Sequence, residues 1–138
     1  MLARTAEVAR EEEAFWQAEV ARVLPQVLLP GKPVRGGGRA VSTAVGEVGY
    51  AMEIERLRGL PAALRRRLVR AAARKVFGEG YVLSSEETAK VLALAGFAGV
   101  GGAVTGGVVT GRVGSRLELH GGLRAERSAR EIRLWRQE

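Results

Sequence analysis

The stretch LPAALRRRLVRAAARKVFG, residues 60–78, decides the fold class because it combines an apolar series with a dense run of arginines. Pro61 is tolerated in the first turn of a helix, and Gly78 suits the position after its last turn. Apolar residues recur at helical spacing in this stretch and just before it: Leu57, Leu60, Leu64, Leu68, Ala71 and Ala72. We therefore expect an amphipathic helix that buries one face in a core.

The other side of this helix is strongly basic. Residues 56–78 hold eight basic residues and no acidic one, whereas a solvated helical face normally mixes both signs. Arg66, Arg70 and Arg74 follow at intervals of four, so they share one face, and Arg67 lies beside them. Like charges at this spacing repel by about 0.2–0.5 kcal/mol per pair. The pattern favours a phosphate-binding ridge, although genomic base composition or thermal adaptation can also enrich a protein in arginine.

Two further helices are expected on either side of this one. Residues 2–28 carry apolar residues at helical spacing, and Pro30 marks the end of that helix. Ser84 or Ser85 suits the N-cap of a third helix, which has acidic residues in its first turn and ends near Gly96. The three helices account for much of the chain.

The C-terminal part alternates between polar and apolar residues as β-strands do. Three strands are expected, at 116–119, 123–127 and 131–135, with a turn at 120–122. A further short strand is expected at 50–54. The glycine-rich segments 31–49 and 96–111 read as loops, the first with or without a short strand at 41–45. The predicted fold is therefore α+β, with three helices and a small antiparallel sheet at the C-terminal end.

Composition removes most kinds of active site. The chain has 138 residues, so one domain spanning 1–138 is the expectation. It has no Cys, Asp or Asn, and His120 is its only histidine, which leaves no thiolate zinc site, Ser-His-Asp triad or EF-hand loop. The remaining carboxylates are all Glu, and none pair with the spacing of a general acid and base. We expect no catalytic site and no metal site in these residues.

One segment raises the question of a membrane span. Residues 91–111 carry no charge and are long enough to cross a bilayer, but they contain seven glycines and mostly small apolar residues. We favour a helix end followed by a glycine-rich loop. The N-terminus lacks the apolar core of a secretory signal, so a cytoplasmic protein is expected.

The excess of positive charge points toward nucleic acid. The formal net charge is +7, from 19 Arg and 3 Lys against 15 Glu, and the guanidinium group binds phosphate bidentately and stacks on bases. A second basic concentration lies in the C-terminal strands, where Arg124 and Arg127 follow the predicted turn. We expect the arginine helix and these strands to form a joint basic surface.

Three segments resemble the bacterial tRNA(Ile)-lysidine synthetases. LPAALRRRLVRAA, residues 60–72, looks like their helix with a leucine, a proline and paired arginines, and LELHGGLRAERSAREIRLW, residues 117–135, is similar to their closing strand pair, L-x-L-P-G-G-L-x-x-x-R. LARTAEVAREEEAFW, residues 2–16, is similar to the long helix that leaves their catalytic domain. The segments follow the family's order, and His120 stands where the family usually has proline.

The resemblance implies a function for the whole chain. The family uses ATP to adenylate the cytidine at the first anticodon position of tRNA(Ile), and lysine then attacks it. That ligase chemistry belongs to an N-terminal PP-loop domain with an SGGxDS motif, which these residues lack. The resemblance thus implies a tRNA-binding domain that holds no cofactor itself, with residues 1–28 as the helix leading from the ATP-binding domain.

The resemblance also implies which residues bind tRNA. Arg66 and Arg67 fall on the paired arginines, Arg65 and Arg70 adjoin them, and Arg127 follows the glycine turn. With the ridge and the strands included, the candidate tRNA-binding set is Arg65, Arg66, Arg67, Arg70, Arg74, Arg124 and Arg127.

Two other functions fit parts of the pattern. A free-standing basic domain could bind an acidic protein partner or another nucleic acid, which explains the charge but not the order of the three segments. A membrane-associated protein could use residues 91–111. Tyr50, Tyr81 and Trp135 could stack on a base, but single aromatic residues of this kind are expected in the core. His120 in the turn is expected to be incidental, with an RNA contact as the alternative.

Overall fold

The computed structural model describes residues 2–33, 38–40, 47–97 and 112–137. Its helices are α1 (Leu2–Val27), α2 (Ile54–Arg58), α3 (Ala62–Phe77) and α4 (Ser85–Leu94). Its strands are β1 (Leu28–Pro30), β2 (Lys32–Pro33), β3 (Arg39–Ala40), β4 (Glu47–Glu53), β5 (Arg116–Glu118), β6 (Arg124–Arg127) and β7 (Glu131–Gln137), with a 3₁₀ turn at His120–Gly122. The predicted α+β class is confirmed, with the sheet at the C-terminal end.

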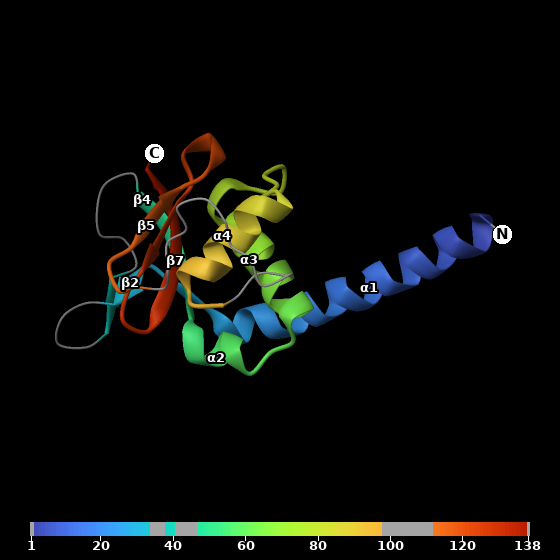
Figure 1. The fold of residues 1–138 in the computed structure, drawn as a ribbon, viewed down its shortest axis with the longest axis horizontal. Helices are drawn as coiled ribbons and strands as arrows, with labels where there is room; N and C mark the ends of the chain where they lie inside the picture. The colour runs from blue at the N-terminus through green and yellow to red at the C-terminus, as the bar shows by residue number, and fades with distance from the viewer. Residues whose placement is uncertain (1, 34–37, 41–46, 98–111, 138) are drawn as a thin grey trace.

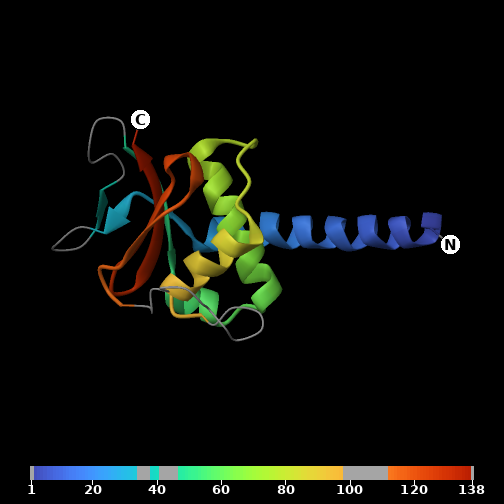
Figure 2. The same cartoon turned by 45° about the horizontal axis from the view of Figure 1, so that its top comes forward.

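One antiparallel sheet organises the fold. Its strand order is β1-β4-β7-β6-β5, and β2 and β3 form a separate two-stranded ladder. Strand β7 is central, and because side chains alternate along a strand, Ile132 and Leu134 lie on one face while Arg133 and Trp135 lie on the other. Figures 1 and 2 show the helices against the first face and β2 on the side of the second. We call these the inner and outer faces.

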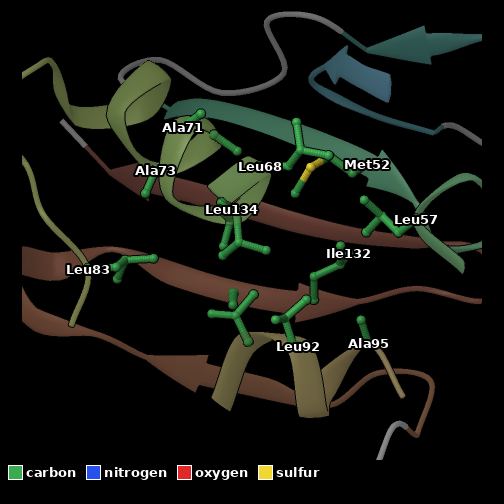
Figure 3. Close-up of a cluster of buried hydrophobic side chains, with 14 of the residues drawn as sticks. Met52, Leu57, Leu68, Ala71, Ala73, Leu83, Leu92, Ala95, Ile132 and Leu134 are labelled. Carbon is green, nitrogen blue, oxygen red and sulfur yellow. The ribbon is translucent and has the colours of Figure 1, made fainter. Parts of the chain in front are cut away.

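The core lies between the inner face and the helices. Leu134 and Leu68 are fully buried, and Ile132 is almost so. Figure 3 shows Leu68 of α3 and Leu92 of α4 pointing toward Ile132 and Leu134 of β7. Burying one such side chain contributes roughly 1.5–3 kcal/mol, so this layer is a large part of the free energy of folding.

Helix α3 is amphipathic as expected. Seven of its apolar residues are buried: Leu64, Leu68, Val69, Ala71, Ala72, Ala73 and Val76. Its five arginines are all among the positions that are not buried. Packing of the apolar face against β4 and β7 therefore sets the direction in which the arginines point.

Helix α1 has two unlike halves. Its C-terminal half packs on α3 and contributes Val23, Leu24 and Val27 to the core. Residues 4–15 are exposed, including Phe15, which keeps 59% of its surface accessible. In Figure 1 this N-terminal half projects away from the rest of the molecule, and the N-terminus lies at its far end.

A capping box begins α4. Ser84 Oγ accepts the Glu87 N–H at 3.0 Å, and the Glu87 carboxylate accepts the Ser84 N–H at 3.2 Å. The same carboxylate accepts the backbone N–H of His120 at 3.0 Å, and His120 Nδ1 lies 2.8 Å from it. Burial alone would raise the pKa of Glu87, but these hydrogen bonds and the nearby imidazole lower it to about 2. Glu87 therefore joins the start of α4 to the turn between β5 and β6.

The structure differs from the predicted elements in three places. Helix α2 was not predicted, because Leu57 continues the apolar spacing of α3 across the break at Gly59 and Pro61. Strand β4 runs over 47–53 rather than 50–54, and β1, β2 and β3 were not predicted. The possible strand at 41–45 and most of the glycine-rich segment 96–111 lie outside the described residues. Within the part that is described, no helix is both long and apolar enough to cross a membrane.

The contacts that Glu87 makes with Ser84 and His120 should stabilise the folded protein. Glu87→Gln should destabilise the protein by about 1–3 kcal/mol at pH 7, because an amide is a weaker acceptor for the two backbone N–H groups. Since the folded-state pKa of Glu87 lies below the ordinary value of 4.5, the advantage of the carboxylate is complete above that pH and disappears toward pH 2. Urea unfolding at pH 7 and pH 3 measures both effects. Glu86→Gln, on an exposed neighbour, is the control; an equal loss at both pH values would contradict the assignment.

Candidate nucleic-acid interface

An open groove of about 710 Å³ runs between α1 and α3. Helix α3 lines it with Arg67, Arg70, Arg74 and Lys75, and the only carboxylates among its described lining residues are Glu13 and Glu79. Helix α1 lines the opposite side with Glu13, Gln17, Val20, Ala21 and Leu24. The groove therefore has a basic side on α3 and a mixed polar and apolar side on α1, which suits a ligand that carries both phosphate and less polar groups.

Arg67 is held by α1. Its Nη1 donates to Glu13 Oε2 at 3.0 Å and its Nη2 lies 2.9 Å from Glu13 Oε1, a forked ion pair. Its guanidinium also lies 5.5 Å from the centre of the Trp16 ring. The hydrogen bond from Arg67 is the main reason that the pKa of Glu13 is lowered. The ion pair with Glu13 thus links α3 to α1 and occupies the Arg67 guanidinium.

Arg70 and Arg74 have weaker contacts within the protein. Arg70 donates to the hydroxyls of Ser85 and Thr88, both at 3.4 Å, which is long for such bonds. Arg74 Nε lies 4.0 Å from a carboxylate oxygen of Glu79, a side chain that is 97% exposed. Both guanidiniums line the groove, so both can exchange these contacts for a stronger anionic partner.

Arg65 and Arg66 are neighbours with different surroundings. Arg65 Nη1 donates to the carbonyl oxygens of Leu57, Arg58 and Leu60 at 3.0–3.4 Å, and its guanidinium lies 4.5 Å from the centre of the Phe97 ring. It therefore satisfies the carbonyls at the end of α2. Arg66 has no hydrogen bond or ion pair with any described residue and does not line the groove.

Arg124 lies on the outer face of the sheet. Its guanidinium is 3.7 Å from Glu118 and 5.1 Å from the centre of the Trp135 ring, which Arg133 contacts at 5.3 Å. The arginines of α3 lie instead in the helix layer on the inner side. The sheet therefore separates Arg124 from the groove, so Arg124 does not share one surface with the arginines of α3.

Arg127 points to the inner face at the end of α4. Its Nη1 donates to the Leu94 carbonyl oxygen at 3.5 Å, and its buried Nε has no hydrogen-bond partner among the described residues. It also lines a second hollow, of about 840 Å³, at the turn between β6 and β7. Three carboxylates line that hollow, and one of them, Glu131, pairs with Arg39 at 2.7 Å, so the charge there is largely balanced.

Two features of the site were not predicted from the sequence: Lys75 in the groove and a stack of rings beside it. Tyr81, expected in the core, lies flat against His120 at 4.4 Å between ring centres and donates its hydroxyl to the His120 carbonyl oxygen at 2.7 Å. Burial, with the nearby Glu87 carboxylate, raises the pKa of Tyr81 to about 12, so this hydroxyl keeps its proton. The Ser84-x-x-Glu87 signal was visible in the sequence, but it does not reveal that Glu87 also reaches His120.

Neither a metal site nor a comparison with known proteins indicates what the groove binds. Among the described residues, no group of three or more His, Cys, Asp or Glu side chains could hold a metal ion. Comparisons with protein-family models, curated proteins and solved structures found no match. The assignment of function therefore rests on the chain's own residues and geometry.

Arg65 and Arg66 should respond differently to removal. Arg65→Ala should lower the free energy of unfolding by about 1–3 kcal/mol, because carbonyls at the end of α2 lose their charged donor. Arg66→Ala should change it by no more than about 0.5 kcal/mol, since its side chain has no described partner. Urea denaturation of the two variants provides the comparison. Equal losses would show that the contacts of Arg65 do not stabilise the fold.

Proposed function

We propose that this chain binds tRNA through the groove between α1 and α3, as the substrate-binding domain of a cytoplasmic tRNA(Ile)-lysidine synthetase. The observation that carries the proposal is the placement of Arg70 and Arg74, two groove-lining guanidiniums with only weak internal contacts. The ordered resemblance of three segments supplies the choice of family. ATP and the ligase chemistry then belong to a PP-loop domain outside these residues.

The proposed path for the RNA backbone follows the contacts within the groove. Glu13 neutralises Arg67, so the path begins at Arg70 and continues past Arg74 to Lys75. The residues in this path face α1 across the groove rather than the sheet. Phosphate contacts of this kind fix the position and orientation of a nucleic acid without reading its sequence. The domain's role in this proposal is to hold the tRNA while the catalytic domain modifies one base.

An acidic protein partner is the second candidate. The forked pair between Arg67 and Glu13 favours it, because it shows a groove guanidinium binding a carboxylate at 2.9 Å. The planar guanidinium fits a phosphate in the same way, so geometry alone does not separate the two ligands. The dependence of binding on salt concentration and on competing RNA distinguishes the two ligands.

The groove proposal predicts a specific loss of RNA binding. Arg70→Ala combined with Arg74→Ala should weaken binding of an unmodified tRNA(Ile) transcript at least tenfold near 0.1 M salt. Because each lost phosphate contact removes about 0.7–0.9 from the slope of log affinity against log salt, the slope should become shallower by about 1.5. Fluorescence anisotropy across a salt series measures both quantities.

Arg4→Ala combined with Arg10→Ala is the matched control. It removes the same charge from the exposed half of α1, away from the groove, and should leave the slope almost unchanged. Equal effects of the two double variants would mean that only net charge matters. Failure of the unaltered chain to bind tRNA, with tight binding to an acidic polypeptide, would favour the second candidate.

A further inference from the structure

Four side chains form a continuous column beside the groove. The Arg136 guanidinium lies 5.4 Å from the centre of the Phe77 ring, Phe77 stacks on Tyr81 at 4.7 Å, and Tyr81 stacks on His120 at 4.4 Å. The interplanar angles are 13° and 8°, so the three rings are nearly parallel. They come from the end of α3, the following loop and the turn between β5 and β6. His120 is the last ring of the column.

The His120 ring is fixed in position but open to solvent. One face lies on Tyr81, and Nδ1 lies 2.8 Å from Glu87, a carboxylate that can only accept, so Nδ1 carries hydrogen. The backbone N–H of His120 is bound by Glu87 as well. The His120 side chain nevertheless keeps 50% of its surface exposed, although one face lies on Tyr81 and the Nδ1 edge lies on Glu87.

The open ring is coupled to the groove through the first turn of α4. On one side of that turn, Arg70 contacts Ser85 and Thr88, while on the other side Glu87 holds His120. The loop between α3 and α4 makes a second connection, because Val82 lines the groove and its neighbour Tyr81 belongs to the column. Arg70 and the His120 ring are therefore held by the same turn of α4, with Tyr81 and Val82 linking the column to the groove.

We propose that the exposed face of His120 is a stacking site for one unpaired base of the bound RNA. A flat, preoriented ring stacks on any base with little loss of side-chain entropy, since the column and Glu87 already hold it in place. Stacking uses the face of the ring, which any base can match, so the site selects an unpaired base rather than a particular base. The inference rests on the proposed function and adds a contact that does not depend on charge.

The test uses the full chain and a single-stranded decaribonucleotide with one 2-aminopurine at its centre. Bound chain should quench the 2-aminopurine fluorescence through stacking, and His120→Ala should lose most of the quenching and bind about tenfold more weakly, or ~1.4 kcal/mol. Its salt slope should stay that of the unaltered chain, because no phosphate contact is removed. His120→Phe keeps a ring but loses the Nδ1 contact, and it should bind and quench normally.

The outcomes separate a stacking role from a structural one. His120→Leu fills space without an aromatic face and should behave like His120→Ala. If His120→Phe loses binding as fully as His120→Ala, or if all three variants bind and quench normally, the stacking site is overturned even where RNA binding with its salt slope remains. If the unaltered chain binds no RNA at low salt, the groove proposal itself fails. Thermal unfolding of each variant confirms that folded proteins are being compared.

Discussion

Burial of the apolar face of α3 against the sheet is the constraint on which the rest of the structure depends. Leu68 of α3 and Leu134 of β7 are both fully buried, and they belong to one core with residues of α1 and α4. Once that face is fixed, the helical period leaves the arginines only the directions away from the sheet. The C-terminal half of α1 packs beside α3, and the groove forms where the basic side of α3 meets it. The position of the groove is therefore a consequence of core packing.

Much of this arrangement was predictable from local signals. The period of α3, the stop at Gly78, the Ser84 cap and the alternation of the C-terminal strands are all properties of neighbouring residues. Pairings between distant segments were not predictable, because Leu28 lies opposite Met52 through contacts that no local pattern records. Helix α2 was not predicted for a different reason: its apolar residues continue the helical spacing of α3, so the sequence does not show it as a separate helix. Strands β2 and β3 have two residues each, which is too short to show a period.

The candidate site also combines features that were predictable from the sequence with features that were not. The sequence predicted that α3 would present a face of arginines, but it could not predict which of them the fold itself would use. Arg67 finds its carboxylate 54 positions away on α1, and Arg65 finds carbonyl oxygens at the end of a helix that was not expected. All of these residues are arginines on one helix, so residue type did not separate those with structural surroundings from those with open ones. Only the tertiary contacts distinguish Arg65 and Arg67 from Arg70 and Arg74.

The distribution of Glu explains why net charge is a poor guide to the binding surface. On the outer face of the sheet, Arg116 pairs with Glu126 directly across the ladder, and Arg124 lies near Glu118 in the same way. The strand register therefore places a glutamate opposite each of these arginines, and their charges are balanced. Helix α3 contains no acidic residue, so its arginines can be neutralised only by side chains from other elements, and those reach Arg67 well and Arg74 poorly. The charge left over for a partner is therefore concentrated where a helix without Glu meets an open groove, which is a property of one element's composition rather than of the whole chain.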